Sequence, residues 1–195
     1  MKNYRLLGMV FVLLLAGAQQ GQAADSKKPV VPCSHPVFRI FDFWVGEWLV
    51  YHRDSGKLAG YDRVSRTLAG CALQQSWISL DDHFSSPNVP FRMNGKSLTA
   101  FDGSRWVQFW VDNQAGSQIL KGGPQDKSFV LSSDQPVGGY DYRMSWTPNK
   151  DGTIYNLSER RKQGSEEWET VFDFIYRRNL NREEFDDEDE DVPDS

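Results

Sequence analysis

The sequence contains few of the residues that metal sites and nucleophilic sites require. Only three of its 195 residues are histidines, and their separations along the chain match no local zinc-binding pattern. The Gly-x-Ser-x-Gly motif, in which many hydrolases present a nucleophilic serine, does not occur. These absences exclude the common sequence signatures of zinc enzymes and serine hydrolases. The sequence accordingly predicts no metal ion, no cofactor and no catalytic residue.

Long apolar runs are equally scarce, with one exception near the start. The run from Leu6 to Ala18 follows two basic residues and precedes a group of small residues. This arrangement predicts a secretory signal peptide over residues 1–24, cleaved after Ala23 or Ala24, and an uncleaved anchor is the alternative. No later stretch is long and apolar enough to cross a bilayer. We therefore expect a periplasmic or secreted protein with no membrane span after cleavage.

The sequence has only two cysteines, Cys33 and Cys71. Thiols in an oxidising compartment tend to pair, so we predict a disulfide that joins an N-terminal extension, residues 25–36, to the start of the third strand. In the chain-entropy view, a bond that closes a loop of this length stabilises the fold by roughly 4 kcal/mol at most. Two buried free thiols are the alternative.

Negative charge is concentrated toward residue 195. The formal net charge is −5, and Glu183 to Ser195 holds nine acidic residues and no basic one. A run of like charges with few apolar residues cannot bury enough surface to fold, which predicts a disordered acidic tail over residues 181–195. Docking of the tail on a basic partner is the alternative. The rest of the chain is near neutral and has no basic stripe, so nucleic acid is not an expected partner.

Between these segments, residues 37–180 form one predicted domain of ordinary size. Short β-rich runs recur along it between turns rich in glycine and aspartate, a pattern typical of an antiparallel sandwich or barrel. No long helical period occurs, although His35 to Phe41 suits a short helical turn at one end of a barrel. Ten strands are expected, at 43–52, 60–68, 72–80, 96–101, 105–112, 117–121, 127–132, 140–147, 152–160 and 168–178.

The octapeptide FDFWVGEW, residues 41–48, favours the barrel. It contains a Gly-x-Trp pair, Gly46 and Trp48, at the start of the first expected strand. In calycin barrels the tryptophan of this pair closes the barrel floor, and the glycine lets the backbone pass close beside it. We therefore predict an all-β fold, a closed antiparallel up-and-down β-barrel of about ten strands. A cation-π contact of Trp48 with Arg178, or with Arg177, is expected to lock the floor.

Alternation within the expected strands places tryptophans and amides on the same faces. Trp106, Gln108 and Trp110 share one face of their strand, and Gln75 and Trp77 share a face of another. Two interpretations follow. The tryptophans either fill a small barrel as its core, or they line a cavity in which a few polar groups orient a small ligand. The second interpretation predicts seven ligand-binding residues: Gln75, Trp77, Trp106, Gln108, Trp110, Arg143 and Asn156.

The longest irregular stretch covers residues 81–95 and contains two prolines, Pro87 and Pro90. A loop of this length in a compact domain is often functional. It is therefore either a lid or portal over a binding site, or a plain surface excursion.

Further motifs follow the octapeptide in a specific order: GCAL at 70–73, GKSL at 95–98, RWVQFWVDN at 105–113, a glycine pair at 122–123, WTP at 146–148, DGT at 151–153 and FIYRR at 174–178. Together these motifs resemble a family of secreted bacterial calycin-like proteins that have no assigned function. The resemblance covers nearly the whole domain. It implies a lipocalin-like barrel and, by analogy of fold, small-molecule binding. The chain departs from the family pattern at Gln75, where relatives often carry Glu, and at Ser158, where a missing Trp would enlarge or empty part of the lumen.

Three functional hypotheses follow, and the leading one is noncovalent binding of a small apolar or aromatic molecule in the barrel lumen. The second is an enzyme, an isomerase or hydrolase, that uses a carboxylate beside the same cavity. Its candidate acids are Glu47, Asp112 and Glu159.

The third hypothesis is a protein-interaction module with a filled core. It would use an outward-facing apolar row on one strand, made of Val107, Phe109 and Val111. The expected oligomeric state is a monomer or a weak homodimer.

Overall fold

The computed structural model describes residues 31–85 and 87–180. The predicted signal peptide, residues 25–30 of the predicted N-terminal extension and the predicted acidic tail lie outside the described residues. Nothing in the structure tests those three predictions.

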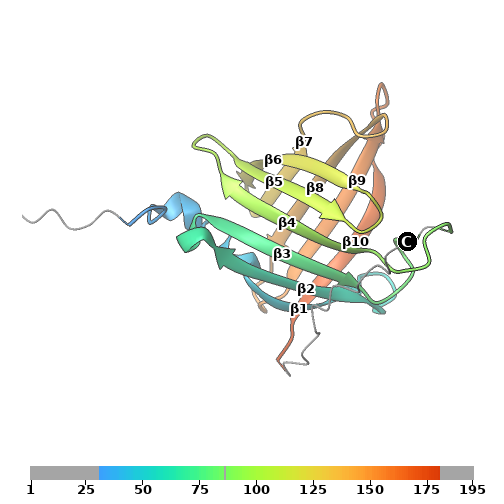
Figure 1. Ribbon diagram of the computed structural model, residues 1–195, viewed down its shortest axis with the longest axis horizontal. Helices are drawn as coiled ribbons and strands as arrows, with labels where there is room; N and C mark the ends of the chain where they lie inside the picture. Colours follow the sequence, from blue (N-terminus) through green and yellow to red (C-terminus); the bar gives the residue numbers. More distant parts are fainter. Residues whose placement is uncertain (1–30, 86, 181–195) are drawn as a thin grey trace, which may run out of the picture. The chain divides into compact units, whose positions relative to one another are not determined.

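Ten antiparallel strands form a closed barrel (Figure 1). Each strand pairs with its neighbours in sequence, and the first strand pairs with the last to complete the circle. The strands are β1 (Gly46–His52), β2 (Leu58–Thr67), β3 (Ala72–Ser79), β4 (Asn94–Phe101), β5 (Trp106–Asp112), β6 (Ser117–Gln125), β7 (Ser128–Ser133), β8 (Tyr140–Pro148), β9 (Ile154–Lys162) and β10 (Glu169–Arg178). This architecture confirms the predicted fold class.

Closure of the barrel gives every strand one face toward the lumen, because side chains alternate along a strand. In β1, Trp48 and Val50 are fully buried, and in β10, Phe174 and Tyr176 are nearly so. Val50 lies opposite Tyr176 in the pairing of these two strands. These alternate residues of each strand point into the barrel and therefore make the interior of the molecule.

The observed strand bounds differ from the predicted ones by a few residues, most of all in β6. Residues 122–124, a Gly-Gly-Pro sequence, were expected to follow the strand, but they continue it and pair with β7. A side chain at Gly122 would collide with the carbonyl oxygen of Val130, so glycine permits this close approach. The chain reverses at Asp126 and Lys127 instead, where Asp126 has a φ of 50°.

Two short helical turns precede the barrel, η1 (Pro36–Arg39) and η2 (Asp42–Trp44). Sequence analysis predicted one turn, over residues 35–41. Between and within these turns, Phe41 and Trp44 have no exposed surface. The Phe41 ring stacks on Phe129 with centroids 3.8 Å apart and meets the edge of Trp146 at 5.1 Å. Phe41 and Trp44, with the rings they contact, form an aromatic plug that fills one end of the lumen.

A disulfide and an arginine fix the segment that leads into the aromatic plug. Cys33 and Cys71 are bonded to each other, which confirms the predicted disulfide. The guanidinium of Arg39 donates to the carbonyl oxygen of Cys33 at 3.1 Å and to that of Gly70 at 2.8 Å. The turn between β2 and β3 is therefore tied to the N-terminal segment by a covalent bond and by two charge-assisted hydrogen bonds.

Trp48, Arg178 and Gly46 meet at the seam between the first and last strands. The Arg178 guanidinium carbon lies 3.9 Å from the centroid of the Trp48 ring, and its Nη1 donates to the carbonyl oxygen of Val45 at 2.7 Å. The indole Nε1 of Trp48 donates to the Trp44 carbonyl oxygen at 2.8 Å. Gly46 has a φ of 152°, and a Cβ there would collide with the guanidinium. Glycine is therefore required where the arginine crosses the chain.

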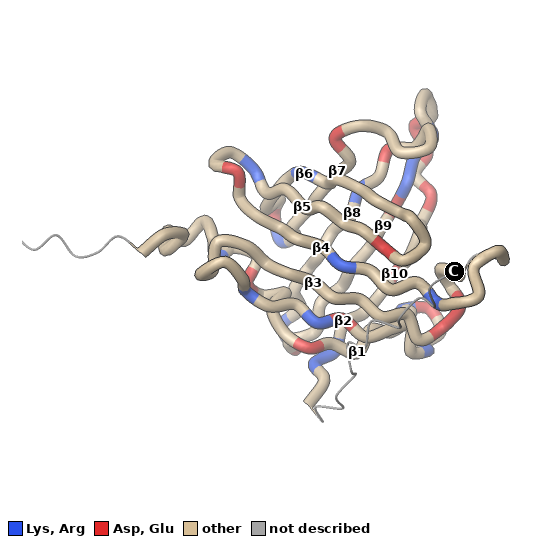
Figure 2. The backbone as a smooth tube through the Cα atoms, viewed as in Figure 1, with Lys and Arg blue, Asp and Glu red and all other residues tan. Residues whose placement is uncertain are grey.

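Along the backbone of the described barrel, basic and acidic positions are interspersed rather than gathered by sign (Figure 2). One apolar row crosses three strands, because Leu98 lies opposite Phe109, which lies opposite Ile119. These three side chains and Val111 are exposed by between 41% and 48%. Within 31–85 and 87–180, no helix has the length and apolar character that a membrane span needs.

The seam predicts a stability difference between two neighbouring arginines. Arg178→Gln should lower the free energy of unfolding by about 1–2 kcal/mol, because it removes a cation-π contact and a charge-assisted hydrogen bond. Arg177 is the matched control, since its guanidinium lies 4.9 Å from the Tyr51 ring on the opposite face. Arg177→Gln should cost about 0.5 kcal/mol or less. Urea titration measures both values, and equal losses would contradict the proposed role of the seam.

Candidate functional site

A cavity of about 170 Å³ lies in the barrel lumen, beyond the aromatic plug. It reaches the loop of residues 80–93, which contributes two side chains to its wall. The helical turns (blue) and this loop (green) lie at opposite ends of the barrel (Figure 1). The cavity is lined by Gln75, Trp77, Phe84, Met93, Gln108, Trp110, Gln118, Leu120, Tyr142, Met144, Trp146, Asn156, Ser158, Val171, Phe172, Phe174 and Tyr176. The lumen is thus packed at one end and unfilled toward the other.

Stacked rings make one part of the wall. Trp77 stacks on Phe174 with ring centroids 5.9 Å apart, and Phe172 stacks on the same ring at 4.6 Å. Phe84 meets Trp77, Phe172 and Phe174 edge-on. These contacts hold the rings in place, so this side of the cavity is an apolar surface of fixed shape.

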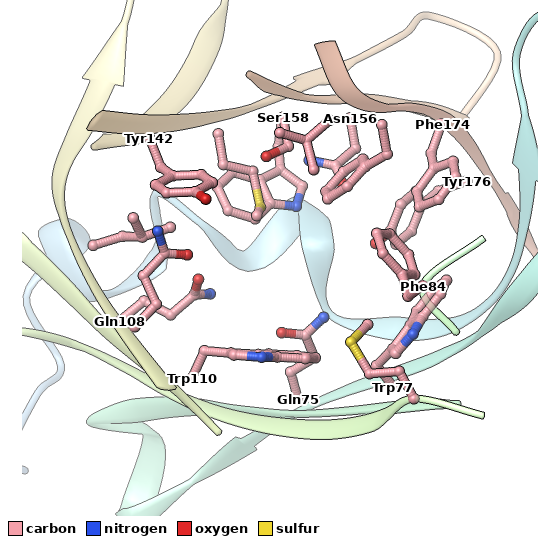
Figure 3. Close-up of a pocket in the computed structure, with 17 residues that line it drawn as sticks. Gln75, Trp77, Phe84, Gln108, Trp110, Tyr142, Asn156, Ser158, Phe174 and Tyr176 are labelled. Carbon is pink, nitrogen blue, oxygen red and sulfur yellow. The ribbon is translucent and has the colours of Figure 1, made fainter. Parts of the chain in front are cut away.

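Trp110 is held differently from the other rings of the wall. Its Nε1 donates to Asp112 Oδ2 at 3.0 Å, which fixes the indole at the rim. The ring covers Gly95 of the neighbouring strand so closely that a Cβ at that position would collide with it. Among the described residues, no aromatic ring stacks on Trp110. One face of the indole is therefore backed by the sheet, and Figure 3 shows it along the wall of the open space.

A chain of hydrogen bonds runs from the cavity into the barrel wall through Gln75. Its side chain projects from one wall toward the middle of the cavity (Figure 3). Gln75 Oε1 accepts from the Ser97 hydroxyl at 2.8 Å, and Gln75 Nε2 donates to Asp62 Oδ2 at 3.1 Å. The Tyr176 hydroxyl is also hydrogen-bonded to the carboxyl of Asp62. Two residues of the cavity wall thus share one buried acid behind them.

Asp62 is a buried acid that sequence analysis did not identify. It has no exposed surface, and its Oδ1 has no hydrogen-bond partner among the described residues. Removal from water raises the pKa of Asp62 to about 7, and the bonds from Gln75 and Tyr176 only partly oppose that rise. Burial likewise raises the pKa of the Tyr176 hydroxyl well above its usual value, with the neighbouring carboxyl adding to the effect. At neutral pH the Asp62 carboxyl is therefore about half protonated, and the Tyr176 hydroxyl stays neutral.

Two further amides of the wall, those of Gln108 and Asn156, are each fixed by one hydrogen bond. Gln108 Nε2 donates to the Thr99 hydroxyl at 3.1 Å. Asn156 Nδ2 donates to the carbonyl oxygen of Ser145 at 3.0 Å. Because a carbonyl oxygen only accepts, the Asn156 amide can point just one way, with its Oδ1 directed elsewhere.

Five of the seven predicted ligand-binding residues line the cavity: Gln75, Trp77, Gln108, Trp110 and Asn156. Trp106 does not line it, although it shares a face with Gln108 and Trp110. It is buried deeper in the lumen, where its ring contacts Phe41 and Phe129 of the aromatic plug. Whether the five residues bind a ligand stays a prediction.

The placement of Arg143 in the lumen is corrected by the structure. In β8, Tyr142, Met144 and Trp146 face the cavity, so Arg143 faces outward, and its side chain is 41% exposed. Its Nε lies 2.7 Å from Glu159 Oε2, and its guanidinium lies over the ring of Trp168 at 4.1 Å. Arg143 is therefore part of an outer ion pair.

The three carboxylates named for an enzyme do not lie in the cavity. Glu47 is near Arg63 on the outer face, and Glu159 pairs with Arg143. Asp112 accepts from the backbone N–H groups of Gln114 and Gly116, and so caps the turn between β5 and β6. None of the three is among the residues that line the cavity.

The loop of residues 80–93 covers part of the cavity mouth. Its Asp81 Oδ2 lies 2.6 Å from His52 Nε2 at the end of β1. His83 Nε2 lies 3.1 Å from the carbonyl oxygen of Val171 in β10. These two contacts seat the loop on strands at the seam, and Phe84 then reaches into the cavity.

No protein-family model matches the chain, and no curated protein matches it significantly. What the cavity binds is therefore inferred from its geometry and chemistry. The resemblance of the sequence motifs to a secreted calycin-like family stays a prediction.

Asp62 predicts a specific dependence of stability on pH. The carboxyl has a pKa near 7 in the folded state and near 3.8 in the unfolded state. As the pH rises, it therefore keeps its proton to a higher pH when the protein is folded. Its contribution to stability is therefore complete below about pH 4 and is lost as the pH rises to about 7. Asp62→Asn should remove this loss, and at pH 8 the variant should be more stable than the parent by roughly 1–4 kcal/mol.

The measurement is the difference in unfolding free energy between parent and variant from pH 4 to pH 8. Asp102→Asn is the control, because backbone N–H groups of Arg105 and Ser104 lower the pKa of Asp102 to about 2. That variant should differ from the parent by a constant amount over the same range. A pH-independent difference for Asp62→Asn would show that the acid is not protonated in the fold.

Proposed function

We propose that this protein binds a small, largely apolar or aromatic molecule noncovalently in the barrel lumen. The observation that carries the proposal is the unfilled cavity of about 170 Å³, since a barrel of this size can otherwise be filled by its own side chains. The cavity has aromatic walls, a few fixed amides and a mouth under one loop. Those features are typical of small-molecule sites.

The driving force would be exclusion of water from the aromatic wall. Side chains such as Trp77, Phe172 and Phe174 already have fixed positions, so little side-chain entropy would be lost on binding. The amides of Gln75, Gln108 and Asn156 would orient the ligand through their hydrogen-bonding atoms. This division of roles gives affinity to the rings and specificity to the amides.

We place this function in the periplasm or outside the cell. The disulfide between Cys33 and Cys71 supports an oxidising compartment. The signal peptide expected over residues 1–24 and the resemblance to secreted calycin-like proteins agree with it. A carrier or scavenger in such a compartment needs no bound metal or second substrate.

The geometry favours binding over catalysis. Asp62 is a fully buried acid close to the cavity, but Gln75 and Tyr176 line the wall in front of it. A general acid or base has to reach the proton that it transfers. Asp62 reaches only the two wall residues, so it positions them and does not contact a bound molecule.

Native mass spectrometry tests the proposal. The full chain, exported to a bacterial periplasm and purified without denaturation, should carry a small-molecule adduct that disappears under denaturing conditions. Ser158→Trp should abolish the adduct, because an indole at this position of the wall would occupy the cavity. Leu157→Trp is the matched control, since the adjacent residue of β9 has the opposite parity and faces away from the lumen.

Circular dichroism and the melting temperature establish that both variants fold. If the parent carries no adduct and shows no thermal shift with any of a panel of small aromatic compounds, the lumen is not a binding site. Loss of binding in both folded variants would place the site elsewhere.

The loop over the mouth predicts a kinetic effect. Phe84→Ala should raise the dissociation rate of a bound probe by about threefold or more, because it opens the mouth and removes apolar contacts. Fluorobenzene, followed by fluorine NMR line shape, is a suitable probe. Phe91→Ala is the control, because Phe91 belongs to the same loop but lies outside the cavity wall. Equal rates in the two variants would mean that the loop does not control exchange.

A further inference from the structure

We propose that the preferred ligand is an uncharged aromatic molecule of one ring or two fused rings that carries a hydrogen-bond donor, the class of phenol and indole. This inference rests on the proposed function and names the ligand class for the same cavity. Four properties of the wall carry it: charge, volume, one open indole face and one oriented oxygen.

The charge of the wall excludes ionic ligands. None of the described side chains that line the cavity belongs to Asp, Glu, Lys, Arg or His. A charged ligand would lose its hydration and find no counter-charge, which is strongly unfavourable in an apolar site. Asp62 lies behind Gln75, and its ionised form would further repel carboxylates and phosphates. Fatty acids and nucleotides are therefore poor ligands.

The volume sets the size. The cavity measures about 170 Å³. A cavity of about 150 Å³ engineered in another protein holds benzene, whereas pockets for drug-sized molecules measure roughly 300–1,000 Å³. A space of this volume suits one ring or two fused rings, and it is too small for a macrocycle.

The open face of Trp110 favours a planar ligand. Gly95 backs one side of the indole, and the hydrogen bond from Nε1 to Asp112 prevents the ring from turning away. Trp77 and Phe172, on another part of the wall, are each stacked on Phe174. Because Trp110 has no such partner among the described residues, a flat ring in the cavity would complete the stack.

The Asn156 side chain favours a ligand with a donor. Asn156 is 1% exposed and lines the cavity, and its Nδ2 is committed to the Ser145 carbonyl oxygen. Its Oδ1 accepts no hydrogen bond from any residue that the structure describes. An acceptor at the wall of a largely apolar cavity has few alternative partners, so an N–H or O–H group on the ligand would be stabilised there.

Three probes of nearly equal shape test the ligand class on the unmodified protein. These are indole, benzofuran, which replaces the N–H by an oxygen, and indole-3-carboxylate, which adds a negative charge. Isothermal titration calorimetry at pH 8 should give a Kd for indole about tenfold or more below that for benzofuran. Indole-3-carboxylate should bind at least a hundredfold more weakly than indole.

Two variants separate the roles of the residues. Asn156→Leu should bind benzofuran about as well as the parent does and lose most of the preference for indole. Trp110→Leu should weaken indole and benzofuran equally, by roughly five- to tenfold, because both would lose the stacking partner. Trp168→Leu, on the outer face under Arg143, is the tryptophan control and should leave all three affinities unchanged.

The outcomes distinguish this inference from the proposed function. Binding of benzofuran with an affinity equal to that of indole would overturn the donor requirement, and tighter binding of the carboxylate would overturn the uncharged class. In either case the lumen would still be a small-molecule site. An absence of heat and of thermal shift with all three probes, in a parent protein that carries a copurified adduct, would overturn the ligand class alone. The same absence in a parent without an adduct would overturn both proposals.

Discussion

Closure of β1 against β10 is the constraint on which the rest of the structure depends. A closed sheet has no free edge, and its circumference fixes the width of the space inside. Every strand must then send alternate side chains into the same narrow volume. At the closing seam, Gly46 leaves room for Arg178, and Arg178 lies against Trp48. How far the strands fill the lumen therefore depends on the size of the side chains at their inward-facing positions.

The two ends of the lumen meet that constraint in different ways. At one end, the chain before the first strand turns inward, and Phe41 and Trp44 pack among rings of the barrel wall. At the other end, rings, amides and Ser158 line the lumen and a cavity remains between them. Because the rings of the aromatic plug are in close contact, the unfilled part is not a failure of packing in general.

The polar residues of the interior differ in whether their hydrogen-bonding groups have partners. Most are satisfied by a neighbour, as Gln75 is by Ser97 and Asp62. Asp62 itself is an exception, because one of its oxygens has no partner among the described residues and its burial favours the neutral form. A buried acid of this kind opposes folding near neutral pH. Local rules of stability are thus broken close to the cavity, where functional sites commonly break them.

Much of this organisation could be predicted from the sequence, because turn residues and alternation are local signals. These signals predicted the ten strands and the inward face of β5. Alternation shows which face of a strand a side chain is on, but it does not show how far along the barrel axis that side chain lies. Trp106 and Trp110 share a face, yet one lies by the aromatic plug and the other at the rim. Arg143 was misplaced because its residue type was weighed above its parity. Asp62 was missed because the parity of β2 follows only from its pairing with Trp48, which is a long-range contact.

The disulfide between Cys33 and Cys71 affects which end of the barrel gives access to the lumen. The disulfide and the bonds of Arg39 fasten the chain just ahead of Phe41 across the mouth of the filled end. That end is sealed by covalent structure as well as by packed rings. The lumen is therefore closed at this end, so any molecule that entered it would have to leave through the same opening at the other end.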